Sequence, residues 1–287
     1  MWKVCNMSSL TVREALQRAS SFLSEIEDGS FLAELIIRHV LGWTRTDFFM
    51  RIDERLTVEQ WTEIEQLTRK RQAGIPLQYL IGEQEFYGLP FKVDASVLIP
   101  RPDTEILVEQ VLKLRDPEKP SVVADIGTGS GAIAVTLATH SVWRLYAVDI
   151  AADSLRLAEE NSRINDVADR ITFLRGDLLT PLPEKVDILV SNPPYIPSRD
   201  IEQLDVQVRN HEPLRALDGG LDGLDFYRRL CAGISEAVKP GGLIAFEVGM
   251  GQARQVEQLL LDTGCIEQTL VVCDLAGIER VVIGTKV

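Results

Sequence analysis

The stretch VVADIGTGSGAIA, residues 122–134, decides the fold of this chain. It opens with apolar and β-branched residues, which are typical of a buried strand, and glycines follow at positions 127, 129 and 131. Glycines at the end of a strand permit a tight turn and let a ligand lie directly against the backbone. The stretch therefore predicts a buried strand, a ligand-facing turn and a helix in close succession.

Further along the chain, apolar runs and helical segments alternate. Four runs favour strands: RLYAVDI (144–150), ITFLRGD (171–177), VDILVSN (186–192) and GLIAFEVG (242–249). The tail QTLVVCDLAGIERVVIGTK (268–286) has the pattern of two strands joined by a turn near Gly277. This alternation indicates an α/β fold with a Rossmann-like, doubly wound sheet. We expect a seven-stranded, mostly parallel sheet with an antiparallel C-terminal hairpin.

Residues 10–74 have a different pattern, which favours helices. Capping boxes of the form T-x-x-E/Q occupy residues 11–14 and 57–60, and each predicts the start of a helix. Ser30 is expected to cap a third helix, which stops at Gly42. This part carries no cluster of catalytic side chains. We interpret it as a small helical domain that docks another molecule, with a stabilising lid as the alternative.

Residues 75–100 alternate aromatic and β-branched side chains around a glycine and a proline, which predicts a β-hairpin. The next stretch, RPDTE (101–105), opens a helix with Asp103 or Thr104 as its cap. Three parts are therefore expected: a helical substrate-docking domain over 1–74, a β-hairpin linker over 75–100 and the domain with the large sheet over 101–287.

The overall composition counts against some classes of protein. The 287 residues are 45% hydrophobic and 25% charged, a balance that can bury a sizeable core. The formal net charge is -13, whereas a protein that grips duplex phosphates normally has a basic face. No apolar stretch approaches the ~18 residues that a membrane span needs. We expect no direct contact with nucleic acid and no membrane span.

The cysteines and histidines favour neither a metal site nor a disulfide framework. The four cysteines (Cys5, Cys231, Cys265 and Cys273) lack C-x-x-C spacing, and the three histidines are far apart. Free thiols fit a reducing compartment, and the N-terminal stretch lacks the apolar core of a signal peptide. The protein is therefore expected to be cytoplasmic, with no bound metal.

Three carboxylates follow the ends of successive predicted strands. Asp125 comes just before the glycine turn, Asp149 ends the second strand and Asp177 ends the third. The carboxyl ends of parallel strands meet at one edge of the sheet, where ligands bind. Asp149 suits both hydroxyls of a ribose, Asp177 an adenine amino group, and Asp125 an ammonium or sulfonium charge. Together they predict an adenosine ligand with a cationic tail, namely S-adenosylmethionine.

The glycine turn is expected to lie against this ligand. Its spacing is G-x-G-x-G, whereas the dinucleotide fingerprint is G-x-G-x-x-G. Glycine-rich first turns also occur in NAD enzymes, so the carboxylates carry much of the distinction. The residues expected to contact the cofactor here are Gly127, Thr128, Gly129, Ser130 and Gly131.

The fourth predicted strand ends in a rigid elbow, Asn192, Pro193, Pro194 and Tyr195, in which two φ angles are fixed. Asn192 offers a side-chain acceptor and the Pro193 carbonyl offers a second, so both hydrogens of a planar NH2 group can be held. Tyr195 supplies a flat wall on which a planar group can stack. The elbow therefore predicts capture of a poorly nucleophilic nitrogen beside the cofactor. An ordinary strand-terminating turn is the alternative.

Four sequence blocks occur in an order that resembles one enzyme family: LIPRPDTE (98–105), DIGTGSGAIA (125–134), VSNPPYI (190–196) and EPLRALDGGLDGLDFYRRL (212–230). The glycine turn, the strand-end acids and N-P-P-Y are similar to those of class I S-adenosylmethionine-dependent methyltransferases that act on planar amino groups. More narrowly, the four blocks resemble the PrmC (HemK) family of peptide chain release factor glutamine N5-methyltransferases. The resemblance extends over nearly the whole chain.

This resemblance implies a reaction and a substrate. A methyl group would move from S-adenosyl-L-methionine to the side-chain amide nitrogen of the glutamine in the Gly-Gly-Gln motif of release factors. Asn192, Pro193, Pro194 and Tyr195 would bind that glutamine, with Asn192, Pro193 and Tyr195 as the catalytic residues. The cofactor contacts would run from Gly127 to Gly131 and include Asp149, Asp177, Leu178 and Asn192.

Other positions are less closely defined. The family often has an aromatic residue where Leu178 stands, so adenine packing is expected to be aliphatic there. Phe86, Tyr87, Arg101 and Glu105 are expected to shape the roof of the site. Two rival functions stay open: adenine methylation in nucleic acid with the same elbow, and a non-catalytic nucleotide-sensing module. A basic groove or a target-recognition domain favours the first, whereas loss of the acids or of N-P-P-Y favours the second.

Overall fold

The computed structural model describes residues 10–287, so Cys5 lies outside the described residues. The chain divides into two compact units. The first contains the chain up to Gly82 together with Val206–His211, and the second contains Glu83–Asp205 and Glu212–Val287. The segment Val206–His211 therefore belongs to the N-terminal unit, although it follows the N-P-P-Y elbow in sequence.

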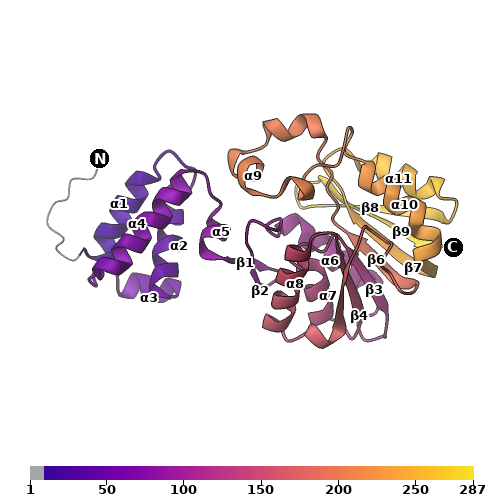
Figure 1. Cartoon of the computed structure of the whole chain (residues 1–287), viewed down its shortest axis with the longest axis horizontal. Coiled ribbons are helices and arrows are strands. Elements are labelled where there is room, and N and C mark those ends of the chain that lie inside the picture. Colours follow the sequence, from indigo (N-terminus) through magenta and orange to yellow (C-terminus); the bar gives the residue numbers. More distant parts are fainter. Residues whose placement is uncertain (1–9) are drawn as a thin grey trace. The chain divides into compact units, whose positions relative to one another are not determined.

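Helices make up the first unit (Figure 1). They are α1 (Val12–Phe22), α2 (Gly29–Leu41), α3 (Arg45–Met50), α4 (Val58–Gln72), α5 (Leu77–Ile81) and α9 (Val206–His211). The predicted capping boxes at Thr11 and Thr57 are confirmed, because each threonine side chain accepts a bond from the backbone three residues further on. Another capping box, Thr44 with Asp47, opens α3 and was not predicted. Local polar pairs thus set the start of three of these helices.

The predicted cap of α2 is wrong, whereas its predicted end is confirmed. The helix begins at Gly29, and Ser30 lies in its first turn, where its hydroxyl accepts from that of Ser20 at 3.3 Å. At Gly29 a Cβ atom would stand 2.1 Å from the Leu23 carbonyl oxygen. This close approach of two chain segments, which requires glycine, sets the start of the helix. The helix ends at Gly42, whose φ of 64° is in the left-handed region.

The predicted caps of α6 (Pro102–Leu114) are wrong as well. Arg101 occupies the N-cap position and makes no side-chain cap bond. Pro102 opens the helix, since its φ angle suits a first turn and it has no N–H group to be satisfied. The side chains of Asp103 and Thr104 bond to other parts of the second unit, Asp103 to Arg280 at 2.9 Å.

A β-hairpin opens the second unit. Its strands, β1 (Glu83–Phe86) and β2 (Leu89–Lys92), pair antiparallel. Tyr87 and Gly88 form the turn, and φ is positive at both, 53° and 74°, as a two-residue hairpin turn requires. The hairpin is therefore shorter than the stretch in which it was predicted, because residues 77–81 form α5 instead.

Seven strands form one mixed sheet, as the sequence predicts. They are β3 (Val122–Ile126), β4 (Arg144–Asp149), β5 (Ile171–Arg175), β6 (Val186–Ser191), β7 (Val238–Glu247), β8 (Ile266–Cys273) and β9 (Glu279–Lys286). Their order is β5-β4-β3-β6-β7-β9-β8. The pairs from β5 to β7 are parallel, whereas β9 is antiparallel to both β7 and β8. The C-terminal hairpin thus extends the parallel part, with β9 inside the sheet and β8 at its edge.

Helices cover both faces of the sheet (Figure 1). They are α6, α7 (Ala132–Thr139), α8 (Ala152–Ile164), α10 (Asp225–Ala237) and α11 (Ala253–Asp262). Helices α6 and α7 pack on the face whose core contains Trp143, and α10 and α11 on the face whose core contains Tyr227. Because both faces are close-packed, the carboxyl ends of the strands are held in fixed positions.

The connecting segments of the second unit hold three short 3-10 helices: η1 (Ala168–Arg170), η2 (Ser198–Gln203) and η3 (Leu214–Ala216). The last of these borders the cavity described below. Over residues 10–287, no helix combines the length and the apolar character needed to cross a membrane.

Candidate active site

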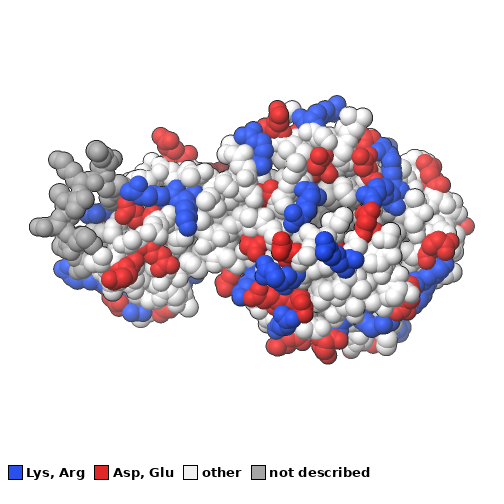
Figure 2. Space-filling view, viewed as in Figure 1, with Lys and Arg blue, Asp and Glu red and all other residues white. Residues whose placement is uncertain are grey.

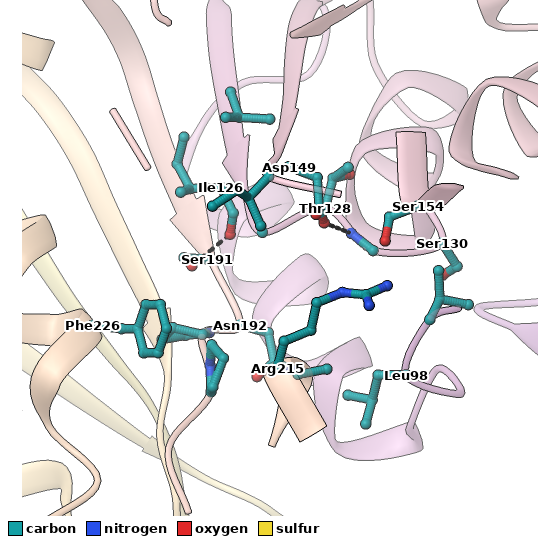
Figure 3. A pocket seen from close by; sticks show the side chains of 18 of the residues that line it. Leu98, Ile126, Thr128, Ser130, Asp149, Ser154, Ser191, Asn192, Arg215 and Phe226 are labelled. Carbon is teal, nitrogen blue, oxygen red and sulfur yellow. Dashed lines mark hydrogen bonds between the residues drawn. The ribbon is translucent and has the colours of Figure 1, made fainter. Parts of the chain in front are cut away.

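A cavity of about 560 Å³ lies at the carboxyl ends of the parallel strands of the second unit. The turns that follow β3, β4, β5 and β6 form much of its wall, and residues within 96–101, 214–218 and 226–229 contribute to the rest. Figure 3 shows side chains around this cavity. Its volume is in the range of small-molecule sites, ~300–1,000 Å³. Doubly wound sheets bind their ligands at this edge.

Most of the residues predicted to form the site line this cavity. They are Gly127, Thr128, Gly129, Ser130, Asp149, Asp177, Leu178, Asn192, Pro193 and Pro194. Three others, Asp125, Gly131 and Tyr195, do not line it. Residues from four separate strand ends are therefore brought together, with three of the expected set outside.

The glycine turn is held by backbone bonds to the neighbouring strand. The amides of Gly127 and Thr128 both donate to the Val148 carbonyl at 2.9 Å. Gly131 has a φ of 81°, and a Cβ atom there would stand 3.0 Å from that of Ala158 on α8. Glycine at this last position is thus required by the close packing of two helices, and the earlier part of the turn faces the cavity.

Asp125 is buried beneath the turn, with 0% of its surface exposed. Its Oδ2 accepts from Thr128 Oγ1 at 2.6 Å and from the Ala134 amide at 3.2 Å, whereas Oδ1 has no hydrogen-bond partner among the described residues. Burial raises the pKa of this carboxyl to about 7, against the effect of the two hydrogen bonds. Asp125 braces the turn against α7, so its position does not favour the predicted contact with a cationic ligand.

Asp149 faces the cavity from the end of β4 (Figure 3). Its Oδ2 accepts from the Gly129 amide at 2.9 Å and its Oδ1 from the Ala151 amide at 2.9 Å. A carboxylate has about four acceptor directions, so these two bonds leave capacity for two hydroxyl donors. The backbone thus orients this carboxylate before a ligand binds.

Asp177 and Leu178 form the wall beyond β5. Asp177 lies after the strand end at Arg175, and its carboxylate is ion-paired with Arg229 of α10. Leu178 has a φ of 49°, a conformation that costs a non-glycine residue ~1–3 kcal/mol. The cavity also contains an aromatic side chain, Phe226, so its wall is not purely aliphatic.

Asn192 stands at the end of β6 with its amide in one orientation. Its Nδ2 donates to Thr104 Oγ1 at 3.1 Å, while its Oδ1 makes no hydrogen bond within the described part of the chain. The preceding Ser191 Oγ donates to the Ile126 carbonyl at 2.7 Å, which ties the ends of β6 and β3 together (Figure 3). The elbow is therefore anchored from two sides, and one side-chain acceptor is left for a ligand.

Tyr195 packs outside the cavity, in the core on the far face of the sheet from α6 and α7. Its backbone carbonyl accepts a hydrogen bond from Gln252 Nε2 at 2.9 Å. Burial raises the pKa of this phenol, so it keeps its proton. This place favours support of the elbow over the predicted stacking on a substrate.

Of the four residues expected to form the roof, only Arg101 lines the cavity. It pairs with Glu212, whose side chain is 2% exposed. Glu105 accepts from the Tyr87 amide at 2.8 Å, which fixes the hairpin turn to α6. Phe86 is buried in the core beneath the hairpin. The roof prediction is therefore wrong for three residues, because they hold the hairpin in place instead.

The charged residues of the cavity wall are balanced. Three arginines and three aspartates line it: Arg101, Arg215, Arg229, Asp149, Asp177 and Asp218. Arg215 has no acidic partner among the described residues, and it donates to the Ser96 carbonyl. In Figure 3 the Arg215 side chain begins near Asn192 and points toward Ser154. A ligand with both positive and negative groups suits such a wall.

Sequence reasoning missed Arg215, Phe226 and Arg229. All three belong to the quoted block 212–230 and line the cavity. None of them follows a predicted strand, so reasoning from strand ends could not place them. The quoted block itself was the only signal in the sequence.

The strand order, the glycine turn and the N-P-P-Y elbow at one cavity define this protein as a methyltransferase. Residues 14–82 match the family model of the PrmC N-terminal domain, and residues 102–209 match that of the methyltransferase small domain. The release factor glutamine methyltransferase of Bacillus anthracis is 43% identical over 95% of this chain and 98% of its own length. That of Moorella thermoacetica is 44% identical over 94% and 97%. The chain belongs to the release factor glutamine methyltransferase family.

A solved structure shares the fold. The crystal structure of a methyltransferase from Pyrococcus furiosus aligns with a TM-score of 0.54, over 76% of this chain and 98% of that chain. The two sequences are 16% identical, so the likeness concerns the fold alone.

Proposed function

We propose that this protein transfers a methyl group from S-adenosyl-L-methionine to the side-chain amide nitrogen of the glutamine in the Gly-Gly-Gln motif of peptide chain release factors. The observation that carries the proposal is the Asn192 amide, whose Nδ2 is engaged by Thr104 while Oδ1 is left as an acceptor at the cavity. An acceptor is what an incoming NH2 group requires. Membership of the family supports the same substrate.

The cavity fits the proposed cofactor. Asp149 has two acceptor directions left for a ribose, and the exposed edge of the glycine turn lies beside it. Arg215, which has no acidic partner among the described residues, suits the carboxylate of the methionine part. Asp177 and Leu178 are the proposed contacts of the adenine ring. When bound, the cofactor supplies an electrophilic methyl group on a sulfonium.

The chain's own contribution to the reaction is to hold the nucleophile. Asn192 Oδ1 and the Pro193 carbonyl each accept one hydrogen of the glutamine NH2, which aims the nitrogen at the methyl carbon. With the cofactor bound, this hold would keep the nitrogen in line for methyl transfer, and the amide proton that the product no longer needs would pass to water. Positioning of this kind can supply ~7–11 kcal/mol of the barrier reduction. Both acceptors bind more strongly as positive charge develops on the nitrogen.

The helical first unit is the proposed docking site for the release factor. It carries none of the cavity residues. Several large apolar side chains are exposed on it, including Phe49 at 56% and Met50 at 80% on α3. Exposed apolar groups of this size favour a protein partner.

Methylation of adenine in nucleic acid is the less favoured function. Figure 2 shows acidic and basic side chains interspersed on the visible face of each unit, without a continuous basic patch. The net charge of -13 also opposes binding of phosphates. A protein substrate used in translation supports the cytoplasm as the proposed compartment of this activity.

Methyl transfer from labelled S-adenosyl-L-methionine tests this function directly. The substrates are a release factor, the same factor with the motif glutamine changed to alanine, and duplex DNA. Label is expected in the first alone. Equal labelling of the alanine variant contradicts the proposed acceptor atom, and labelling of DNA alone supports the rival function.

A further inference from the structure

The N-P-P-Y elbow is poor in backbone donors. Pro193 and Pro194 have no N–H group, so neither can be fixed by donating a hydrogen bond to its surroundings. The proposed function nevertheless needs the Pro193 carbonyl and Asn192 Oδ1 at fixed positions, because a displacement of about 1 Å can lower a rate by on the order of 10²-fold. Contacts of another kind must therefore hold the chain that follows β6.

The side chain of Gln252 makes such contacts. Its Nε2 donates to the Tyr195 carbonyl at 2.9 Å and, over a longer distance of 3.5 Å, to the Gly223 carbonyl. Its Oε1 accepts from the Gly249 amide at 3.0 Å. Gln252 is 8% exposed and does not line the cavity. Although it occupies the N-cap position of α11, it makes no side-chain cap bond there. Its amide is directed to the elbow and the loops beside it.

Only an amide side chain can make this set of bonds. The Gly249 N–H group needs an acceptor, whereas the carbonyls of Tyr195 and Gly223 need a donor, so the orientation of the Gln252 amide is fixed. A carboxylate would satisfy Gly249 but would face two carbonyl oxygens with no hydrogen between them. An apolar side chain would leave all three backbone groups without this partner in a buried place.

A glycine-rich loop that precedes α10 also packs against the elbow. The Gly219 amide donates to the Ile196 carbonyl at 2.8 Å. A Cβ atom at Gly219 would stand 2.8 Å from the Pro194 carbonyl oxygen. A Cβ atom at Gly223 would stand 2.3 Å from the Tyr195 carbonyl oxygen. A side chain at either glycine would therefore push against the backbone of the elbow.

We propose that Gln252 is a positioning residue for methyl transfer. Together with Gly219 and Gly223, it fixes the chain just after Pro193, and so sets the direction of the two acceptors that hold the glutamine amide. The inference rests on the proposed function, because those acceptors matter only if the elbow binds an NH2 group. Gln252 acts through the Tyr195 carbonyl and does not itself reach the cavity.

The chain offers two matched controls on β7. The Tyr227 hydroxyl donates to the Glu247 backbone carbonyl at 2.7 Å, so Tyr227→Phe removes a buried hydrogen bond from the end of this strand. A Cβ atom at Gly242 would stand 2.8 Å from the Lys239 carbonyl oxygen, the same close approach to a backbone oxygen as at Gly219. Gly242→Ala therefore strains the second unit without pressing on the elbow. Both controls are expected to lower the Tm and to leave kcat unchanged.

The experiment measures methylation of a release factor by the full chain at saturating cofactor, with the KM for the release factor, cofactor affinity and Tm in parallel. Gln252→Met is expected to lower kcat ~10- to 100-fold, with little change in KM or cofactor affinity. Gln252→Glu, assayed at about pH 8.5 so that the carboxyl is ionised, is expected to lose at least as much, because it keeps the bond to Gly249 and loses the one to the elbow. Gly219→Ala is expected to lower kcat similarly.

Three results overturn the inference. The first is wild-type kcat in Gln252→Met. The second is wild-type kcat in Gln252→Glu, which would assign any effect of Gln252 to Gly249. The third is a loss of kcat in either control as large as that in Gln252→Met. If Gln252→Met does not fold, Gln252→Glu and Gly219→Ala decide the matter. Failure of the wild-type chain to methylate the motif glutamine is a separate result, which contradicts the proposed function itself.

Discussion

The side chains of Asn192 and Thr104, 88 positions apart in the sequence, are joined by a hydrogen bond of 3.1 Å in which Asn192 is the donor. The bond runs from the end of β6 to the first turn of α6. It uses the NH2 group of Asn192 and leaves the oxygen available to a ligand. The chemical character of the N-P-P-Y elbow therefore depends on a residue that lies outside the motif.

Asn192→Ala is expected to lower kcat ~10²–10³-fold, as does removal of other preorganised partners of a transition state. Asn192→Asp keeps an acceptor of the same shape but places a negative charge near a sulfonium whose charge disappears in the reaction. Cofactor affinity is then expected to survive better than turnover. Single-turnover methylation with cofactor affinity in parallel checks both. If both variants keep wild-type turnover, Asn192 serves only to form the turn and does not hold the substrate amide.

Asp149→Ala is expected to weaken cofactor binding by about one to two orders of magnitude for each ribose hydroxyl bond that is lost, because each charge-assisted bond contributes ~1.5–3 kcal/mol. The carboxylate also holds the Gly129 amide, so part of the loss comes from a looser turn. Asp149→Asn retains one acceptor oxygen and is expected to lose less. Calorimetric titration measures both, and unchanged affinity in the alanine variant rules out the ribose contact.

Asp125→Asn is expected to change how stability depends on pH. The folded-state pKa of Asp125 is about 7, above the ordinary value of 3.8, so its contribution to stability is greatest below pH 3.8 and declines until about pH 7. The variant lacks this decline. Its free energy of unfolding should therefore improve relative to wild type between pH 5 and pH 8, by on the order of 1–3 kcal/mol. Denaturant titrations at the two pH values measure this, and a constant difference contradicts it.

Removal of the first unit is expected to abolish methylation of release factors and to preserve cofactor binding. The variant lacks residues 1–82 and carries a glycine-serine linker in place of 206–211, because that segment belongs to the same unit. All residues that line the cavity are kept. Calorimetry and methyl transfer check the two outcomes. If this variant methylates full-length release factor at the normal rate, the helical first unit is not the docking site.

Features set by neighbouring residues could be predicted from the sequence. The capping boxes at Thr11 and Thr57 and the alternation of strands and helices need only a few adjacent positions, and the structure confirms them. Ser30 failed as a cap because a distant close contact at Gly29 fixes the helix start. Asp103 failed because it pairs with Arg280, which lies in another part of the unit.

In the candidate site too, some residues could be placed from local sequence and others could not. Strand ends place Asp149 and Asn192 at the cavity, since the topology of a parallel sheet brings such ends together. Whether a side chain faces the cavity or the core depends on contacts across the unit, which no local pattern contains. Asp125 and Tyr195 therefore turned out to support the site from beneath, and Arg215 was missed.

The position of β9 inside the sheet has a consequence for synthesis on the ribosome. Both of its neighbours, β7 and β8, are translated before it, so the sheet has an unfilled slot until residues 279–286 emerge. During that interval the antiparallel side of β7 exposes unpaired backbone groups, which invite pairing with other chains. A stop codon just before Glu279 would remove an interior strand, so a nascent chain of that length should aggregate although every cavity residue has already been made.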